Sequence, residues 1–280
     1  MVERHLAKVN VASSNLVFRF FKTHTSVCVF CFIQRMIYMK RILSIMRSTI
    51  QKYNMINDGD RIAAAVSGGK DSMVMLEALS RLREFYPQKF DLGAICIDIG
   101  FDGADFSGVE KYCRDKAIEC HIEKTVIKTV VFDKMKEKSP CSLCARMRRA
   151  ALCSTAEKLG YNKIALGHNR EDANETLLMN IFKNGKIECF EPVTDYDDKN
   201  ICIIRPMVAV PEGLMAAGCK RNSIPVTKKV CPVDGYTDRQ KIKNIIKEMS
   251  EENKNLAKNI FASIEKHECF ASKVHEVKNK

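Results

Sequence analysis

The 280-residue sequence lacks several features that mark other classes of protein. No apolar stretch reaches the roughly 20 residues that a membrane-spanning helix needs, so we expect no membrane span. Internal repeats and low-complexity tracts are absent from the sequence, which excludes an array of stacked repeats. Tryptophan is missing altogether. The chain is nevertheless long enough for a full hydrophobic core, in one large domain or one domain with appendages.

Negative charge is scarce relative to positive charge. The 46 Lys and Arg residues outnumber the 34 Asp and Glu residues, which gives a formal net charge of +12. Such a surplus suits a polyanionic partner such as nucleic acid, although a solvated basic surface would also explain it. Cysteine is abundant, with 13 residues. Because this number is odd and the thiols are scattered through hydrophobic segments, the pattern disfavours a secreted disulfide framework and favours a reducing, cytoplasmic compartment.

The first 38 residues form an atypical extension, with one acidic residue, Glu3, in the first 35 and no clear periodicity. Three interpretations are open. The extension is a transit-like or membrane-surface segment, or a small metal or redox site at Cys28 and Cys31, or a disordered or mis-assigned stretch upstream of the natural start. We favour the last interpretation, with the start at Met36 or Met39, because organised sequence begins only there.

Beyond this extension, short buried strands alternate with amphipathic helices. Strands are predicted at 61–66, 92–98, 120–125, 163–166 and 201–204. Helices are predicted within 39–58, at 72–85, 106–116, 141–159 and 171–183, and from Asp238 onward. This alternation indicates an α/β fold with a Rossmann-like, parallel five-stranded sheet covered by helices, with ligand sites at the carboxyl ends of the strands. We expect a catalytic domain at 59–220 and a terminal segment at 221–280.

The first predicted strand runs directly into a glycine-rich loop at the start of a helix. Residues 66–72 read Val-Ser-Gly-Gly-Lys-Asp-Ser. Glycines let the backbone approach an oxyanion, the first amides of the helix point at it, and Lys70 adds positive charge, so this loop is predicted to bind phosphate. The common P-loop is excluded, because it places four residues between its first glycine and Gly-Lys-Ser/Thr. A glycine turn without a ligand is the alternative.

Three cysteines carry metal-ligand chemistry. Cys141 and Cys144 lie on the first turn of a predicted helix, where the helix terminus and nearby arginines favour thiolates. A thioredoxin-like redox pair and two incidental cysteines are the alternatives. With Cys231 as a third thiolate, the set suits a [4Fe–4S] cluster with one open iron for a ligand such as hydrosulfide, rather than a closed four-ligand zinc site. Asp234 could close that corner, but a carboxylate is a poor match to a soft site.

A third segment follows the fourth predicted strand. Gly167 would allow the backbone to approach a nucleotide closely. Asp172 opens the next helix, either as its cap or, together with Asp71, in a magnesium shell. For His168, a contact with nucleotide or substrate and a hydrogen bond within the loop stay equally open.

These motifs occur in the same order in the tRNA 2-thiocytidine synthetase (TtcA) family of PP-loop ATP pyrophosphatases, which the sequence resembles over about residues 40–250. The resemblance implies a fold of the adenine nucleotide alpha-hydrolase type. It also implies that ATP, Mg²⁺ and a [4Fe–4S] cluster serve to replace the C2 oxygen of a tRNA cytidine with sulfur. The cluster would be held by Cys141, Cys144 and Cys231, and catalytic roles would fall to Lys70, Asp71 and Asp172. The residues implied to bind ATP are Ser67, Gly68, Gly69, Lys70, Asp71, Ser72, Ile97, Gly167 and His168.

The sequence departs from the family at the late motif. The family commonly has Cys-x-x-Cys-Gly there, whereas this chain has Asp234 in place of the second cysteine. This change leaves a three-cysteine cluster intact but weakens the transfer of the cytidine assignment. The paired zinc-finger cysteines of the related thiouridine branch are missing.

The implied partners are tRNA and a sulfur donor, such as a cysteine desulfurase or free sulfide, and a homodimer is left open. Basic residues flank the cluster motifs and are expected to contact the RNA backbone, with a solvated basic face as the alternative. They are Arg146, Arg148, Arg149, Lys220, Arg221, Lys228 and Lys229. Two other functions compete: a PP-loop ligase of the amidating or lysidine-forming type, which needs no cluster, and a non-catalytic, metal-containing RNA-binding protein.

Overall fold

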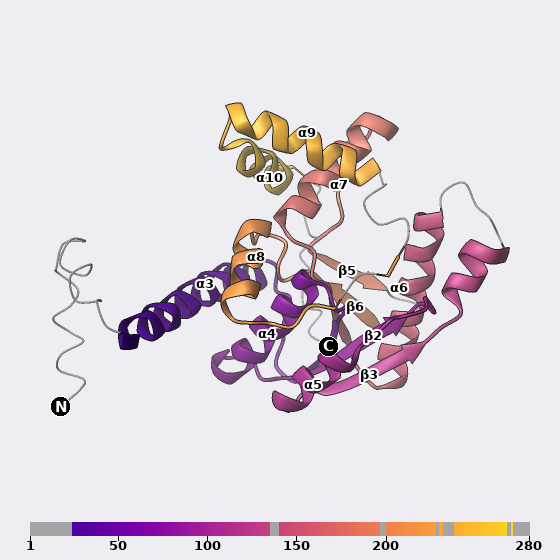
Figure 1. Cartoon of the computed structure of the whole chain (residues 1–280). Coiled ribbons are helices and arrows are strands. Elements are labelled where there is room, and N and C mark those ends of the chain that lie inside the picture. The colour runs from indigo at the N-terminus through magenta and orange to yellow at the C-terminus, as the bar shows by residue number, and fades with distance from the viewer. Residues whose placement is uncertain are drawn as a thin grey trace, which may run out of the picture.

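The computed structural model describes residues 24–134, 140–196, 200–227, 230–231, 238–267 and 270, without the side chains of 24–35 and 134. These residues form one six-stranded sheet with helices packed on it (Figure 1). The strands are β1 (Asp60–Ala65), β2 (Phe90–Asp98), β3 (Glu119–Lys124), β4 (Lys163–Ala165), β5 (Val193–Tyr196) and β6 (Ile201–Ile204). The helices are α3 (His24–Lys52), α4 (Lys70–Phe85), α5 (Ser107–Asp115), the π-helix η2 (Thr129–Lys134), α6 (Pro140–Lys158), α7 (Arg170–Asn184), α8 (Glu212–Arg221), α9 (Asp238–Glu252) and α10 (Leu256–Lys266).

The strand order places the phosphate loop at a change of direction in the sheet. The order is β3-β2-β1-β4-β6-β5, so the chain first builds outward from β1 to β3 and then returns to add β4 on the other side of β1. All pairs are parallel except β5 with β6. The crevice outside the carboxyl ends of β1 and β4 is therefore a topological switch point, where open α/β sheets bind ligands.

The two faces of the sheet bury alternate residues of each strand. Ile62 and Ala64 of β1 face a large core that includes residues of α3, α4 and α8. Ala63 of β1 faces the opposite core, where Leu152 and Ala156 of α6 pack against the sheet. Alternation of the side chains along a strand produces this division. As a result, α4 and α6 cover opposite faces and both reach the switch point.

These observations confirm the α/β fold with a mainly parallel central sheet, and correct three details. The sheet has six strands because β5, an antiparallel edge strand, was missed; its sequence Val-Thr-Asp-Tyr is short and only partly buried. The first helix begins at His24 rather than near Met39. Helix α8 was not predicted; its Gly218 lets α8 pack on α3, since a Cβ there would lie 2.6 Å from Ile42 Cδ1.

The terminal helices predicted from Asp238 onward are present as α9 and α10. They pack against α7, and Figure 1 shows the three helices grouped beyond one edge of the sheet. Within the described residues, none of the helices combines the length and the apolar character needed to cross a bilayer.

A buried carboxylate fixes the helix that follows the phosphate loop. Glu77 of α4 is buried, and its oxygens accept hydrogen bonds from Arg81 Nε (2.6 Å) and Tyr112 Oη (2.6 Å). Lys116 Nζ lies 2.9 Å from the same carboxylate. Burial opposes ionisation, but hydrogen bonds from Tyr112 and Lys116 outweigh it, so the pKa of Glu77 lies below its ordinary value. This carboxylate therefore ties α4 to α5.

We predict that Glu77→Gln lowers the free energy of unfolding by about 1–3 kcal/mol, because two cations lose their partner. Since the folded pKa is depressed, the carboxylate stabilises the fold above its unfolded pKa, and this stabilisation is lost as the pH falls through the folded value. The difference in the free energy of unfolding between wild type and Glu77→Gln should therefore shrink as the pH falls below about 4. Urea unfolding at several pH values measures it. The control is Glu84→Gln, at an exposed position on the same helix; equal effects of the two substitutions would contradict the account.

Candidate functional site

The phosphate loop requires glycine for two separate reasons. Gly68 has φ +76°, in the left-handed region that side chains disfavour. Its carbonyl accepts a hydrogen bond from Thr227 N (2.9 Å), and a Cβ on Gly68 would lie 2.6 Å from Thr227 Oγ1. Ser72 Oγ closes the loop by accepting from Ser67 N (3.2 Å) and donating to Gly69 O (2.9 Å). Within the described residues, no side-chain hydrogen bond caps the start of α4. The first amides of this helix are thus available to an anion.

The lysine of the loop is held by carboxylates. Lys70 Nζ donates to Asp71 Oδ2 (2.9 Å) and to Glu212 Oε1 (2.8 Å) at the start of α8. Lys243 Nζ of α9 donates to Glu212 Oε2 (2.8 Å). Burial works against the charged form of Lys70, but its hydrogen bonds to Glu212 and Asp71 outweigh that cost and raise its pKa. The other oxygen of Asp71, Oδ1, is buried and has no hydrogen-bond partner among the described residues. This oxygen is therefore free to accept a donor or a cation.

The segment after β4 packs directly on the phosphate loop. A Cβ on Gly167 would lie 3.1 Å from both N and Cα of Ser72, so the backbone here lies against the first turn of α4; the predicted approach to a nucleotide stays a prediction. Asp172 forms a capping box at the start of α7, in which Oδ2 accepts from Asn169 N (2.9 Å). Its Oδ1 accepts from Arg239 Nη1 (3.1 Å). Burial raises the pKa of Asp172, and the charge of Asp71 adds to this effect.

His168 lies in a stack of side chains. Its ring is stacked on Phe190, with the ring centroids 4.8 Å apart, and the Arg205 guanidinium carbon lies 5.1 Å from the centroid of Phe190. Burial, with the charges of Arg205, Arg239 and Arg149, lowers the pKa of His168 to about 3. The imidazole is therefore neutral at physiological pH. Its Nδ1 is buried without a hydrogen-bond partner in the described part of the chain.

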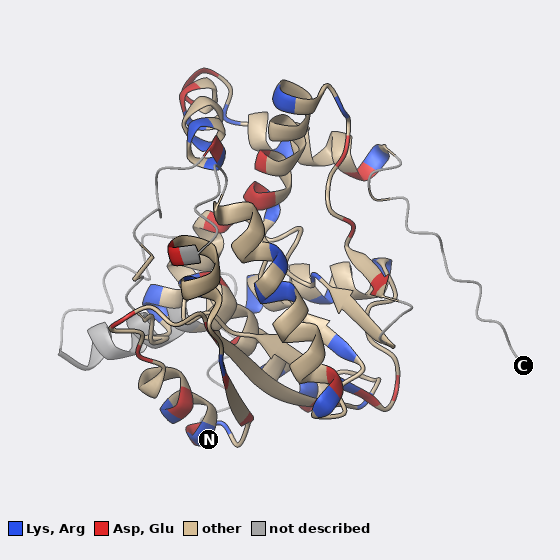
Figure 2. Cartoon of the chain, turned by 90° about the vertical axis from the view of Figure 1, so that its right-hand side faces the viewer, with Lys and Arg blue, Asp and Glu red and all other residues tan. Residues whose placement is uncertain are grey.

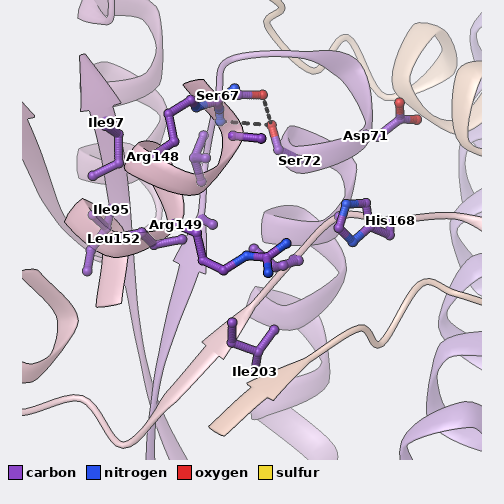
Figure 3. A pocket seen from close by; sticks show the side chains of 15 residues that line it. Ser67, Asp71, Ser72, Ile95, Ile97, Arg148, Arg149, Leu152, His168 and Ile203 are labelled. Atoms are coloured by element: carbon purple, nitrogen blue, oxygen red, sulfur yellow. Dashed lines mark hydrogen bonds between the residues drawn. The ribbon is translucent and has the colours of Figure 1, made fainter. Parts of the chain in front are cut away.

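A cavity of about 320 Å³ adjoins the phosphate loop (Figure 3). Figure 3 shows Arg148 and Arg149 reaching into it from α6, with His168 on the opposite side. Its apolar wall comes from β1, β2, β6 and α6 and includes Ile95, Leu152 and Ile203. A cavity with polar groups at the loop and an apolar wall beside them suits a nucleotide.

A second cavity of about 300 Å³ adjoins the first, and the two share Ser67, Ile97 and Arg148. Its other lining residues come from the phosphate loop, from the end of β2 and the loop that follows it, and from the segment that follows α8. They are Gly69, Asp98, Ile99, Phe101, Ala104, Asp105, Phe106, Thr227, Val230 and Cys231.

The three thiols predicted to bind the cluster lie near enough that the charges of Cys141 and Cys231 affect the pKa of Cys144. Cys141 is exposed, and Cys144 and Cys231 are half-buried. Burial raises the pKa of Cys144, while the charge of Arg148 lowers it and the thiolates of Cys231 and Cys141 raise it further. In the described residues, no three metal-type side chains are close enough to bind one ion. A cubane cluster takes each thiolate on a different iron, so its ligands stand further apart, and this soft donor set fits such a cluster.

A family model described as a PP-loop domain matches residues 41–249. Curated relatives agree with this match. The tRNA-cytidine(32) 2-sulfurtransferase of Citrifermentans bemidjiense is 36% identical over 227 residues, which cover 80% of this chain and 89% of the relative. The protein of the same name from Geobacter sulfurreducens is 38% identical over 217 residues, 76% of this chain and 84% of the relative. This chain belongs to the tRNA-cytidine(32) 2-sulfurtransferase family of PP-loop proteins.

A solved structure supports the fold of this PP-loop family member. The U34-tRNA thiolase NcsA from Methanococcus maripaludis, described with its [4Fe-4S] cluster, superposes with a TM-score of 0.69 at 22% identity. The superposition covers 83% of this chain and 79% of NcsA. At this level of identity, the similarity is evidence for a shared fold and for nothing more.

The PP-loop site contains most of the residues expected from the sequence. Those that line one or both cavities are Ser67, Gly69, Asp71, Ser72, Ile97, Arg148, Arg149, Gly167, His168 and Cys231. Lys70 and Asp172 lie beside the cavities, engaged with Glu212 and Arg239. Arg146 is exposed on α6, where basic residues outnumber acidic ones (Figure 2). Three predicted residues lie outside the described part of the chain: Lys228, Lys229 and Asp234. For Cys28 and Cys31 the structure describes the backbone but not the side chains.

Sequence reasoning missed three contributors to the site. Thr227 lies against Gly68, but the two residues are far apart in the sequence and no local motif predicts their contact. Glu212 holds Lys70 from the start of an unpredicted helix. Arg205 could have been found, because it directly follows the apolar strand Ile201–Ile204 at the carboxyl edge of the sheet.

We predict that Gly68→Ala destabilises the protein by about 2–4 kcal/mol, because a Cβ there is both strained and in collision with Thr227. Pyrophosphate release from ATP should fall about a hundredfold, since displacement of the loop misplaces the phosphates. The matched control is Gly59→Ala. Gly59 has φ +80°, but a Cβ there has no neighbour within 4 Å, so only the cost of strain, about 1–2 kcal/mol, is expected. Thermal unfolding measures the stability of each variant, and a pyrophosphate assay measures its activity. Similar results for Gly68→Ala and Gly59→Ala would disprove the role of Thr227.

Proposed function

We propose that this PP-loop protein activates the C2 carbonyl oxygen of a tRNA cytidine with ATP and replaces that oxygen with sulfur. The single observation that carries the proposal is the pair of adjoining cavities. One adjoins the phosphate loop, the other includes Cys231, and they share Ser67, Ile97 and Arg148. A reaction that first joins a nucleotide to a second substrate and then brings in sulfur needs a nucleotide site next to a site that sulfur can reach.

The first step is adenylation. The triphosphate binds at the amides of α4 with Lys70 beside it, which requires Lys70 to exchange a carboxylate partner for phosphate. The base O2 attacks the α-phosphorus; an oxygen–phosphorus bond forms, the bond from the α-phosphorus to the bridging oxygen breaks, and pyrophosphate leaves. Magnesium would neutralise phosphate charge, and Asp71, whose Oδ1 has no hydrogen-bond partner among the described residues, would hold it.

The second step exchanges the activated oxygen. A sulfide nucleophile attacks C2, the C2–O bond breaks, AMP leaves with the former base oxygen, and one proton is released. A [4Fe–4S] cluster on Cys141, Cys144 and Cys231 would supply an open iron position that accepts inorganic sulfide. The protein contributes the position of the thiols: Cys231 lines the second cavity, and Cys144 neighbours Ala145, which lines the first. Such thiolates persist only in a reducing compartment.

The substrate must present an unstacked base to these cavities. Sequence-specific RNA recognition generally targets single-stranded loops, whose bases can be splayed out. The relatives are named for cytidine 32 of tRNA, and we propose the same target here. The net charge of +12 and the exposed Arg146, Arg148 and Arg149 of α6 provide cations for the RNA backbone. The sulfur donor is free sulfide or a cysteine desulfurase.

We predict that Cys141→Ala and Cys231→Ala each lower the yield of 2-thiocytidine more than about a hundredfold, together with the iron content, while the protein stays folded. The measurement is nucleoside mass spectrometry of tRNA after reaction with anaerobically prepared protein, ATP and sulfide. The control is Cys153→Ala on the same helix, a buried core position that should keep both iron and activity. Undiminished 2-thiocytidine in either cluster variant would refute the assignment of the thiols.

A further inference from the structure

The second cavity has the lining of a base-binding pocket. Its volume of about 300 Å³ suits a small planar molecule, and Phe101, Phe106 and Ile99 give it an apolar, aromatic wall. Phe101 is fixed edge-on against Phe132 of η2, with the ring centroids 5.4 Å apart. Aromatic rings are the usual surfaces on which unstacked bases lie.

One carboxylate in this wall is rigidly placed. Asp98 ends β2, and its carbonyl accepts hydrogen bonds from Thr125 N (2.9 Å) and Thr125 Oγ1 (2.8 Å). Its side-chain Oδ1 accepts from Gly100 N (2.9 Å). Its Oδ2 receives no hydrogen bond from any described residue, although Asp98 is half-buried. Asp98 lines the second cavity, and one of its carboxylate oxygens is an unused acceptor.

The second carboxylate of the cavity is placed differently. Asp105 is exposed, and its Oδ1 accepts from Ser107 N (2.8 Å) at the start of α5. It is suited to capping that helix, and its exposure weakens any hydrogen bond that it would offer to a ligand. Asp98 is therefore the acceptor that can discriminate between ligands.

From these features we infer that the second cavity receives the extruded pyrimidine of the tRNA, and that Asp98 selects cytosine by accepting a hydrogen bond from its 4-amino group. A carboxylate that accepts from the cytosine amino group is a standard means of recognising this base. Uracil has a carbonyl oxygen at that position, which the carboxylate repels. The inference rests on the proposed function and adds to it the pocket for the base and the residue that determines its specificity.

The second cavity could hold either the tRNA base or the adenine of ATP, and the position of Cys231 favours the base. Both rings carry an amino group that Asp98 could bind. Cys231 lines the second cavity but not the first, and sulfur has to reach the pyrimidine rather than the adenine. The shared residue Arg148 is exposed and forms no ion pair within the described residues, so it can bridge ATP phosphate and the base.

Asp98→Asn tests the inference, because asparagine keeps the acceptor for Gly100 while offering an amide N–H that can donate to the uracil carbonyl. Two tRNA transcripts are used that differ only in cytidine or uridine at position 32. The wild type should bind and thiolate the cytidine transcript preferentially. In the variant, we expect kcat/KM for the cytidine transcript to fall about ten- to a hundredfold, the preference to narrow or reverse, and KM for ATP to stay unchanged.

Two further variants sharpen the result. Asp102→Asn changes an exposed carboxylate of the same loop, paired with Lys128 and outside the cavity, and should leave the base preference intact. Asp105→Asn changes the other carboxylate of the cavity and should have a smaller effect than Asp98→Asn. An unchanged cytidine preference in Asp98→Asn, a switch in Asp105→Asn instead, or a raised KM for ATP would each overturn the inference.

Binding and turnover separate this inference from the proposed function. The dissociation constants for the two transcripts, measured without ATP, report the base preference even if no sulfur is transferred. A wild type that binds both transcripts equally contradicts the inference. A wild type that prefers the cytidine transcript but forms no 2-thiocytidine supports the inference and contradicts the proposed function.

Discussion

The site depends on the contact between two backbone segments at the switch point of the sheet. Gly167, after β4, lies so close to the first turn of α4 that an added Cβ would be 3.1 Å from Ser72 N and Cα. On the other side of the loop, Gly68 leaves room for Thr227. Packed interiors do not deform continuously, so these two contacts fix the phosphate loop between β4 and the segment after α8. The two cavities follow from that placement.

Charge around the loop is balanced before any substrate arrives. Lys70 is neutralised by Asp71 and Glu212, and Glu212 in turn pairs with Lys243 of α9. Arg239 of the same helix pairs with Asp172. The terminal helix α9 is thereby linked by ion pairs to the helices that begin at the site. Under the proposed function, an incoming triphosphate would replace carboxylates at Lys70 with phosphate oxygens, so its binding would exchange existing interactions instead of filling a bare basic pocket.

The sequence allowed the α/β class, the glycine-rich loop and the positions of β1, β2, β3, β4 and β6 along the chain to be predicted, because apolar period and glycine placement are local signals. It did not reveal β5, whose half-polar edge position leaves little pattern, or α8, whose glycine serves packing against Ile42. Cys141, Cys144 and Cys231 were proposed as cluster ligands from their chemistry, but the cavity beside Cys231 depends on where the chain returns after α8. Thr227 and Glu212 were missed for the same reason: long-range partners of a motif have no sequence signature of their own.

The central claim is that the C2 oxygen of the base leaves with AMP. It is tested most directly with tRNA that carries ¹⁸O at C2 of the target cytidine, incubated with the protein, ATP and sulfide. The account predicts one ¹⁸O atom in the AMP for each 2-thiocytidine formed, with pyrophosphate unlabelled. Unlabelled AMP alongside 2-thiocytidine, or label retained in the tRNA while pyrophosphate is released, would contradict it.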